Sequence, residues 1–448
     1  MHYLKNISTV CFFLLINLVT YAQRSDSVHA FSIQQCVDYA KQHNMQVKNA
    51  LLDYKIQQQD NRATTAQALP SVTGSAGLTD YLQIPTTLLP GEFFGQPAGT
   101  YIPVKFGTKY NATTGVTLQQ TLFDGQVFVG LQARQTSLDY RQKNADITEE
   151  NIRANVYKVY YQLVVSKTQM QQLDANIERT KNLLHVNTEM LKNGFAEKID
   201  ADRTSVQLAN LETEKAKVQA SINNGYLGLK FLMGMPVQDS LSLTEDITED
   251  KIKEDLLNEG LYKYTDRNDY QYLELGKKLN EYNVKRYKLS YIPVLSLTGN
   301  YSKQAQRTKF NIFGSGDWFT TSYIGLNLSV PIFDGFQKDA NIKKAKLQLQ
   351  QTQNMLDNLK ISIDNDVMQA TNNFRTAIGT MDYQKKNMQL AEQVYSQAQK
   401  KYESGTGTNL DITNAQSDLR IAQSNYVSSM YDAIIAKIDY LKAIGKLP

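Results

Sequence analysis

The stretch Gly325–Phe336, GLNLSVPIFDGF, alternates apolar and polar side chains and ends on Phe-Asp-Gly. A similar stretch, GVTLQQTLFDGQ, occupies residues 115–126, about 210 residues earlier. A period of two indicates a β-strand with one apolar and one polar face. We therefore predict such a strand in each half of the chain. In the second half the predicted apolar face consists of Ile324, Leu326, Leu328, Val330 and Ile332.

Other landmarks recur in the same order, which indicates an internal duplication. Pro70 in QALPSVTGSAGL corresponds to Pro293 in SYIPVLSLTGNY. The segment LKNGFAEKIDAD (191–202) corresponds to YESGTGTNLDIT (402–413). A further glycine follows 40 residues after the first glycine of each of these segments. Two similar halves are therefore expected, each with the same sequence of elements.

After each Phe-Asp-Gly the apolar spacing changes to about 3.5 residues, which predicts long coiled-coil helices. In the first half this seam includes Leu173, Ile177, Leu184 and Leu191. A helix over 335–404 would be about 105 Å long. We expect each long helix to pack antiparallel to two shorter helices placed end to end. The predicted helices span 45–69, 125–193 and 196–234 in the first half, and 268–292, 335–404 and 408–445 in the second.

The remaining boundaries follow from composition. Residues 1–22 have basic residues, an apolar run and a small-residue cleavage site, which predicts a secretory signal peptide. A membrane anchor is the alternative, but the apolar run is too short to span ~30 Å of hydrocarbon as a helix. The predicted division of the rest is a first repeat at 23–235 with a strand pair within 70–123, an acidic equatorial segment at 236–266, and a second repeat at 267–448 with a strand pair within 293–333. Residues 79–114, between the first two strands, contain Pro85, Pro90, Pro97 and Pro103, which predicts a loop.

Composition argues against several functions. The chain is 42% hydrophobic and 21% charged, which is typical of a folded protein. The net charge is +4 and no Lys/Arg run is present, so no nucleic-acid partner is expected. Removal of the signal leaves Cys36 alone, which predicts no internal disulfide. His29, His43 and His185 are scattered and no phosphate-binding glycine loop occurs, so we expect no enzyme site, metal or cofactor.

The predicted strands pose a physical problem. About four strands of ten to twelve residues fit the length of tilted transmembrane strands. Unpaired sheet edges cost several kcal/mol per backbone group in hydrocarbon, and the smallest common barrels have about eight strands. The chain should therefore oligomerise, with eight strands in a dimer or twelve in a trimer. A soluble sheet of two hairpins is the alternative, but the signal and the long helices favour the membrane.

Taken together, these motifs resemble the TolC-like outer-membrane efflux proteins over nearly all of the chain after the signal. SIQQCVDYAKQHNMQVKNA resembles the family's opening helix, RNDYQYLE its second-half counterpart, PIFDG its strand-to-helix junction and YESGTGTNLDIT its periplasmic tip. The resemblance implies a membrane α/β fold. Three chains would form a 12-stranded outer-membrane β-barrel, with four strands per chain, continued by a long periplasmic α-helical coiled-coil barrel.

The resemblance also implies a function and partners. The chain would be an outer-membrane channel, the exit duct of a tripartite efflux or type I secretion system in a Gram-negative-type cell envelope. It would passively conduct drugs, metals or proteins from an inner-membrane pump and a periplasmic adaptor (membrane fusion) protein to the outside. The alternative is an exported periplasmic or surface coiled-coil structural or adhesive protein, which would explain the helices but not the repeated strands.

The resemblance assigns three sets of site residues. Glycine suits a reversal between antiparallel helices, so the adaptor-contact tips have a simpler interpretation as turns. Gate carboxylates around a narrow pore would attract cations, whereas Asp at a helix start is also common. Gly407 and Asn414 replace an arginine and an aspartate of the family, which leaves Lys198 as a substitute partner. The sets are the tips Gly194, Phe195, Ala196, Gly405, Thr406 and Gly407; the pore gate Asp411, Asp200, Tyr402 and Asn414; and the membrane-to-periplasm junctions Phe123, Asp124, Gly125, Phe333, Asp334 and Gly335.

Overall fold

The structure is a computed structural model, which describes residues 28–448 except 246, 254–261 and 313. The predicted signal peptide at 1–22 therefore lies outside the described residues. The chain divides into two compact units. We call residues up to 52, 143–271 and 357–448 the helical unit, and residues 53–142 and 272–356 the sheet unit. Within the described ranges, no helix is both long enough and apolar enough to cross a membrane.

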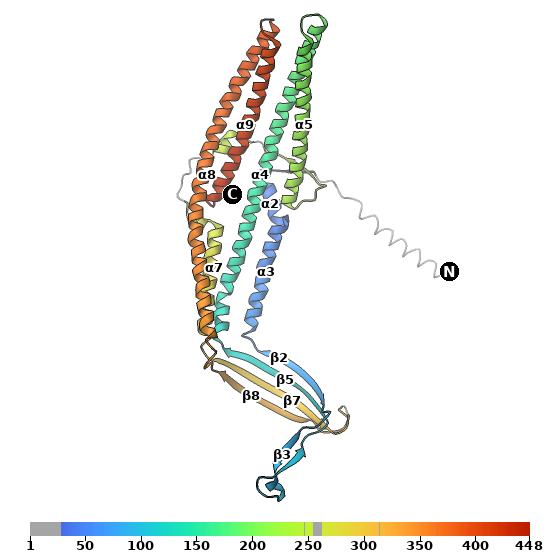
Figure 1. The fold of residues 1–448 in the computed structure, drawn as a ribbon, viewed down its shortest axis with the longest axis vertical. Helices are drawn as coiled ribbons and strands as arrows, with labels where there is room; N and C mark the ends of the chain where they lie inside the picture. The colour runs from blue at the N-terminus through green and yellow to red at the C-terminus, as the bar shows by residue number, and fades with distance from the viewer. Residues whose placement is uncertain (1–27, 246, 254–261, 313) are drawn as a thin grey trace, which may run out of the picture. The chain divides into compact units, whose positions relative to one another are not determined.

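The sheet unit contains a four-stranded antiparallel sheet in the order β2-β5-β7-β8 (Figure 1). The outer strands β2 and β8 come from different halves of the sequence. In the single chain each has one side without a neighbouring strand in this sheet. The strands are β2 (Ser71–Asp80), β5 (Tyr110–Phe123), β7 (Val294–Arg307) and β8 (Phe319–Ser329).

The pairing register separates the two faces of this sheet. Leu118 lies opposite both Val72 and Gly299, and Gly299 lies opposite Ile324, so one row across the sheet is apolar. The neighbouring row, on the other face, consists of Thr73, Thr117, Asn300 and Tyr323. In that row Asn300 donates a hydrogen bond of 3.1 Å to the hydroxyl of Thr117. The alternation predicted for single strands therefore extends across all four of them.

Two features of the sheet unit differ from the expected elements. Strand β8 ends at Ser329, so Val330 and Ile332 lie beyond it. Pro331 explains the early end, because proline has no N–H to continue a ladder. The expected loop between residues 79 and 114 contains a hairpin of β3 (Thr86–Pro90) and β4 (Tyr101–Lys105), joined through the short 3-10 helix η1 (Gly91–Phe94).

Two long helices and several shorter ones build the helical unit, and four of its helices, α3, α4, α7 and α8, continue into the sheet unit. Asn44 separates α2 from α3, and its side-chain oxygen accepts hydrogen bonds from the backbone N–H groups of Gln46 and Val47. The large buried side chains include Tyr160, Leu163 and Met381. The helices are α2 (Ile33–His43), α3 (Met45–Ala66), α4 (Gly125–Lys192), α5 (Lys198–Met233), α7 (Asn268–Leu289), α8 (Gln337–Glu403) and α9 (Asn409–Ala443).

The acidic segment after α5 is fastened to the helices of the same unit. Its strand β6 (Ser240–Leu243) pairs in parallel with β1 (Val28–Phe31). Its helix α6 (Glu249–Lys253) reaches α8 and α9, because Glu249 pairs with Lys385 at 2.8 Å and accepts a 2.6 Å hydrogen bond from Tyr426. The segment continues through the 3-10 helix η2 (Tyr264–Asp266), beside the end of α9. The segment thus links the two halves within the helical unit.

Candidate functional site

Two helix-to-helix turns lie at the same end of the helical unit (Figure 1). The first joins α4 to α5 and the second joins α8 to α9. Gly194 and Gly405 have φ angles of 80° and 72°, the left-handed conformation that glycine adopts without a steric penalty. The backbone N–H of Phe195 donates to Met190, and that of Thr406 donates to Lys401, which closes each helix end. The predicted tip residues therefore lie in the two turns, each of which is closed by a glycine in the left-handed conformation.

The surfaces of these turns differ in chemistry. Phe195 is 79% exposed, so the first turn presents an apolar ring to solvent. In the second turn the hydroxyls of Ser404 and Thr406 are 3.0 Å apart, and a Cβ on Gly407 would lie 3.0 Å from the backbone nitrogen of Tyr402. An arginine at position 407 would therefore require the turn to shift. Ala196 is half-buried beneath the first turn.

Just inside the turns, a chain of hydrogen bonds joins four helices. Tyr402 on α8 donates to the side-chain oxygen of Asn187 on α4 at 2.6 Å. The amide of Asn187 donates to Asn409 on α9 at 3.0 Å, and also to the hydroxyl of Thr204 on α5 at 2.9 Å. The amide of Asn409 in turn donates to the carboxylate of Asp200 on α5 at 3.0 Å. We call these five residues the tip network.

The tip network is largely removed from water. Asn187 and Thr204 have no exposed surface, and Asn409 is 8% exposed. Burial, and secondly the charge of Asp200, raises the pKa of Tyr402 above its usual value, so its hydroxyl is held in the neutral, donating form. Of the predicted gate residues, Asp200 and Tyr402 thus belong to one network, although two asparagines lie between them. In this chain Asn409, rather than Lys198, is the partner of Asp200.

The other two predicted gate residues lie outside this network. Asp411 forms a capping box with Thr408: its carboxylate accepts from the backbone N–H of Thr408 at 3.1 Å and from its hydroxyl at 2.6 Å. These bonds lower the pKa of the Asp411 carboxyl below its ordinary value. Asn414 is exposed about one turn further along α9. Within one chain, Asp411 therefore has the helix-start role that was its simpler interpretation.

Sequence reasoning did not identify Asn187, Asn409 or Thr204. A signal was present for Asn187, since it lies between Leu184 and Leu191 in the predicted apolar seam, where a polar side chain needs a partner. Two further polar layers lie between α4 and α9. Their residues on α9 are spaced seven positions apart. The three layers pair Asn187 with Asn409, Thr180 with Gln416, and Asn176 with Gln423.

The predicted junctions lie in the sheet unit, where strands lead into helices. Asp124 accepts a 2.7 Å hydrogen bond from the backbone N–H of Gln126 at the start of α4. Asp334 accepts a 2.9 Å bond from the N–H of Lys338 in α8. Helix α8 begins at Gln337 rather than at the expected position 335, because Gly335 and Phe336 have left-handed φ angles of 64° and 68°. The exposed rings at the junctions are Phe123, Phe333 and Phe336.

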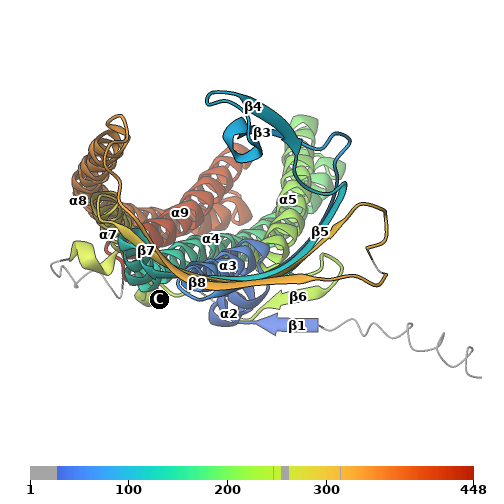
Figure 2. The same ribbon diagram turned by 90° about the horizontal axis from the view of Figure 1, so that it is seen from below.

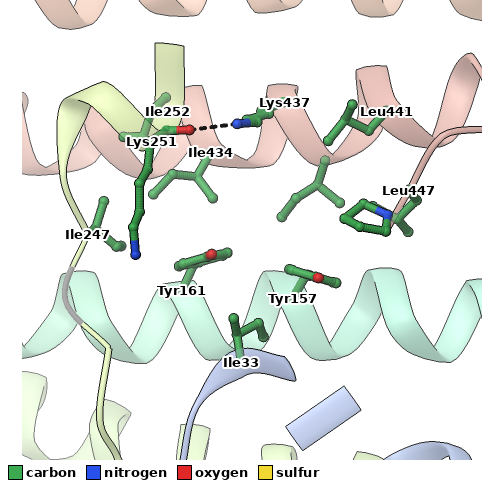
Figure 3. A pocket seen from close by; sticks show the side chains of 12 residues that line it. Ile33, Tyr157, Tyr161, Ile247, Lys251, Ile252, Ile434, Lys437, Leu441 and Leu447 are labelled. Atoms are coloured by element: carbon green, nitrogen blue, oxygen red, sulfur yellow. Dashed lines mark hydrogen bonds between the residues drawn. The ribbon is translucent and has the colours of Figure 1, made fainter. Parts of the chain in front are cut away.

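Two of the cavities in the helical unit lie near the elements described above. One, of about 320 Å³, lies beside the tip network and is lined by Tyr395, Tyr402 and Met190 among others. The other, of about 310 Å³, is largely apolar and lies between α4, α9 and the acidic segment (Figure 3). In Figure 3 the rings of Tyr157 and Tyr161 face this cavity, and Lys437 donates a hydrogen bond to the backbone oxygen of Lys251. No cluster of three metal-ligating side chains occurs among the described residues.

Comparison with known proteins gives a consistent class. A family model described as Outer membrane efflux protein matches residues 271–446. The outer membrane efflux protein BepC of Brucella suis biovar 1 (strain 1330) is 25% identical over 341 residues, covering 75% of this chain and 72% of BepC. The outer membrane protein TolC of Vibrio cholerae serotype O1 is 20% identical over 340 residues, covering 75% of this chain and 77% of TolC.

The fold gives the same answer. The crystal structure of the outer membrane protein VceC from Vibrio cholerae matches with a TM-score of 0.72 at 17% identity, covering 92% of this chain and 96% of VceC. The fold class is therefore that of the outer-membrane efflux channels. Sequence and fold thus confirm the resemblance to the TolC-like outer-membrane efflux proteins that the sequence motifs predicted. Because the matched family model and the relatives are outer-membrane efflux proteins, the predicted outer-membrane location and efflux function are confirmed.

Proposed function

We propose that three copies of this chain form one exit duct, with a twelve-stranded barrel in the outer membrane and a coiled-coil barrel of helices in the periplasm. The division of the sheet into an apolar and a polar face supports this proposal most strongly. Four strands per chain with two free outer edges need further strands in hydrocarbon, and three copies supply twelve. The apolar face would contact lipid and the polar face would line water.

The direct test is the oligomeric state in the membrane. Detergent extraction of the outer membrane should give a trimer that dissociates on heating, and the purified trimer should form channels in a planar bilayer. A monomer in the soluble periplasmic fraction would refute the duct and favour an exported coiled-coil protein. No catalytic step is needed for this function, because conduction is passive and its driving force comes from partners.

The exposed turns are the proposed contact with a periplasmic adaptor, through which an inner-membrane pump would deliver substrates. Their exposure and the apolar ring of Phe195 support this assignment. Adaptor capture should fall when Phe195 is replaced by Ser, and should be unchanged for Phe231→Ser, which alters an equally exposed ring near the far end of α5 from the turn. Equal capture by both variants would remove the first turn from the adaptor surface.

We further propose that the tip network and Asp411 form the gate. The bonds between α4, α5, α8 and α9 would hold the tip closed, and three symmetry-related Asp411 carboxylates would attract cations at the narrow end. Asp411→Asn should reduce the block of single-channel current by multivalent cations. Asp418→Asn removes an exposed carboxylate from the same helix and serves as the control. Unchanged block in Asp411→Asn would exclude this residue from the constriction.

A further inference from the structure

The hairpin formed by β3 and β4 has apolar side chains without a core to bury them. Its tip is ordered: the N–H of Gly91 donates to the backbone oxygen of Thr100 at 2.7 Å, and a Cβ on Gly91 would lie 2.2 Å from the Thr100 hydroxyl oxygen. An isolated two-stranded hairpin is at best marginally stable in water. Large exposed apolar side chains nevertheless surround it: Leu82 at 91%, Leu88 at 60%, Phe93 at 81%, Phe94 at 55%, Tyr101 at 64% and Phe106 at 58%.

The charge of this segment suits contact with an identical surface. Between Asp80 and Lys105 the sequence has one charged side chain, Glu92. Copies of the hairpin could therefore meet while bringing few like charges together. Exposed apolar patches of this kind mark binding surfaces in soluble regions of proteins.

The position of the hairpin indicates which partner covers it. The four-stranded sheet is curved, and the hairpin turns from the outer end of β2 toward the concave side of that sheet (Figures 1 and 2). In a closed barrel the concave side encloses the lumen, and lipid lies on the convex side. A hairpin on the lumen side is thus turned away from lipid. In three symmetric copies it is turned toward the same hairpin of the other two chains.

We infer that the β3–β4 hairpins of three copies pack against one another over the lumen and form an apolar constriction at the outer mouth of the channel. This inference rests on the trimeric duct proposed above. Hydrophobic constrictions restrict ion flow by excluding water from the narrow part of a pore. The channel would then have two barriers of different chemistry, a hydrogen-bonded one at the tip and an apolar one at the outer mouth.

Distances between spin labels in the full-length trimer test this packing. A Phe93→Cys variant carries the label on the hairpin, and an Asp80→Cys variant carries it at the end of β2 as the control. The native Cys36 is fully buried and burial raises its thiol pKa to about 12, so the reagent is directed to the introduced cysteine. Twelve strands about 4.8 Å apart and tilted by about 40° give a barrel about 24 Å across, so labels on its wall should lie about 20 Å apart.

Labels at position 93 are expected to lie closer together than labels at position 80. Longer distances at 93, with relaxation enhanced by lipid-soluble oxygen, would overturn the inference in favour of lipid. Longer distances with enhancement by a water-soluble relaxation agent would overturn it in favour of a free hairpin. If no trimer forms, or if the labels at position 80 do not give the distance expected for the barrel wall, the proposed trimeric duct is refuted. If the labels at position 80 do give that distance, the labels at position 93 test only the contact between hairpins.

Conductance gives an independent readout. Replacing Phe93 and Phe94 together by Ser should raise single-channel conductance by about twofold or more, because polar side chains let water wet the constriction. Phe310→Ser is the matched control, since Phe310 is 64% exposed in the loop between β7 and β8, near Tyr110. Equal conductance of the double variant, the control and the unaltered trimer would refute an apolar constriction at the hairpins.

Discussion

The hydroxyl of Tyr402 lies 2.6 Å from the side-chain oxygen of Asn187 and donates a hydrogen bond to it. The two residues are 215 positions apart and belong to different halves of the duplicated chain. Each half contributes a pair of antiparallel helices with a turn at its end, and this bond is one of the contacts that join the pairs. Changes in the tip network should therefore alter stability and, in the proposed channel, gating.

Tyr402→Phe should lower thermal stability and increase the open probability of the channel. The change leaves the buried oxygen of Asn187 without its donor, which costs about 1–3 kcal/mol in typical proteins. Because Tyr402 is only half-buried, the lower end of that range is expected. Calorimetry and single-channel recording measure the two effects. Tyr395→Phe, which removes a hydroxyl from the same helix, should change neither.

Asn409→Asp should make stability depend on pH. The new carboxylate would face Asp200 in place of an amide, and two ionised carboxylates repel each other. Stability should therefore fall more at about pH 7 than near pH ~4, where one of the pair accepts a proton. Asn414→Asp adds the same charge at an exposed site of the same helix and should show little of this dependence. Parallel pH profiles for the two variants would contradict the placement of Asn409 beside Asp200.

Thr408→Ala should unravel the first turn of α9. Loss of an N-cap side chain costs about 0.5–2 kcal/mol, and hydrogen exchange of the first backbone amides of α9 should accelerate. The bonds from Thr408 lower the folded-state pKa of Asp411, so their contribution is present above the ordinary Asp pKa of about 3.9 and is lost as pH falls through the lower folded value. The exchange difference between variant and parent should therefore shrink under strongly acidic conditions. A constant difference there would argue against the cap.

Gly234→Ala should destabilise the helical unit. Gly234 ends α5 with a φ angle of 70°, and an added Cβ would lie 2.5 Å from the backbone oxygen of His43 at the end of α2. We expect a loss of more than about 1 kcal/mol in unfolding free energy. Gly228→Ala is the control, because its Cβ would meet no atom within 4 Å and Ala favours a helix interior by about 0.5–1 kcal/mol. Thermal unfolding should move in opposite directions for the two variants.

Leu326→Lys and Asn327→Lys test which face of the sheet contacts lipid. A lysine on the lipid face of a barrel costs about 2–4 kcal/mol near the middle of the bilayer, whereas a lysine facing the lumen mainly changes ion selectivity. Leu326 lies in the apolar rows and Asn327 in the polar rows. Leu326→Lys should therefore reduce trimer assembly more than Asn327→Lys does. Gel electrophoresis of heated and unheated samples measures the fraction of trimer. The reverse order of damage would mean that the faces are assigned the wrong way round.

The sequence predicted the four long strands and the long helices because their signals are local. Period-two alternation and the change to a coiled-coil spacing need no knowledge of distant residues. The β3–β4 hairpin was not predicted, since Pro90 and Pro103 argued for a loop. Proline is tolerated there because each strand of a two-stranded sheet is an edge strand, and Pro103 pairs with Leu88 in the register without a required N–H.

The contacts of the tip network could not be predicted from local sequence patterns alone. A resemblance pointed to Asp200 and Tyr402, but the asparagines that connect them are 222 residues apart in the chain. Only the antiparallel packing of α4 on α9 brings Asn187 to Asn409. Asp411, in contrast, has the role that its own neighbourhood predicts, since Thr408 is three residues away and the pattern of a capping box is local.

The parallel pairing of β1 with β6 has a consequence for the order of folding. Four residues at Val28–Phe31 pair with Ser240–Leu243, so this short sheet closes a loop of more than 200 residues. Contacts of such high sequence separation form late, because the chain between them loses conformational freedom before any pairing is gained. During synthesis or export from the N-terminal end, β1 therefore cannot pair with β6 until α4 and α5 have also emerged. The attachment of β1 is then a marker that the first half has been completed.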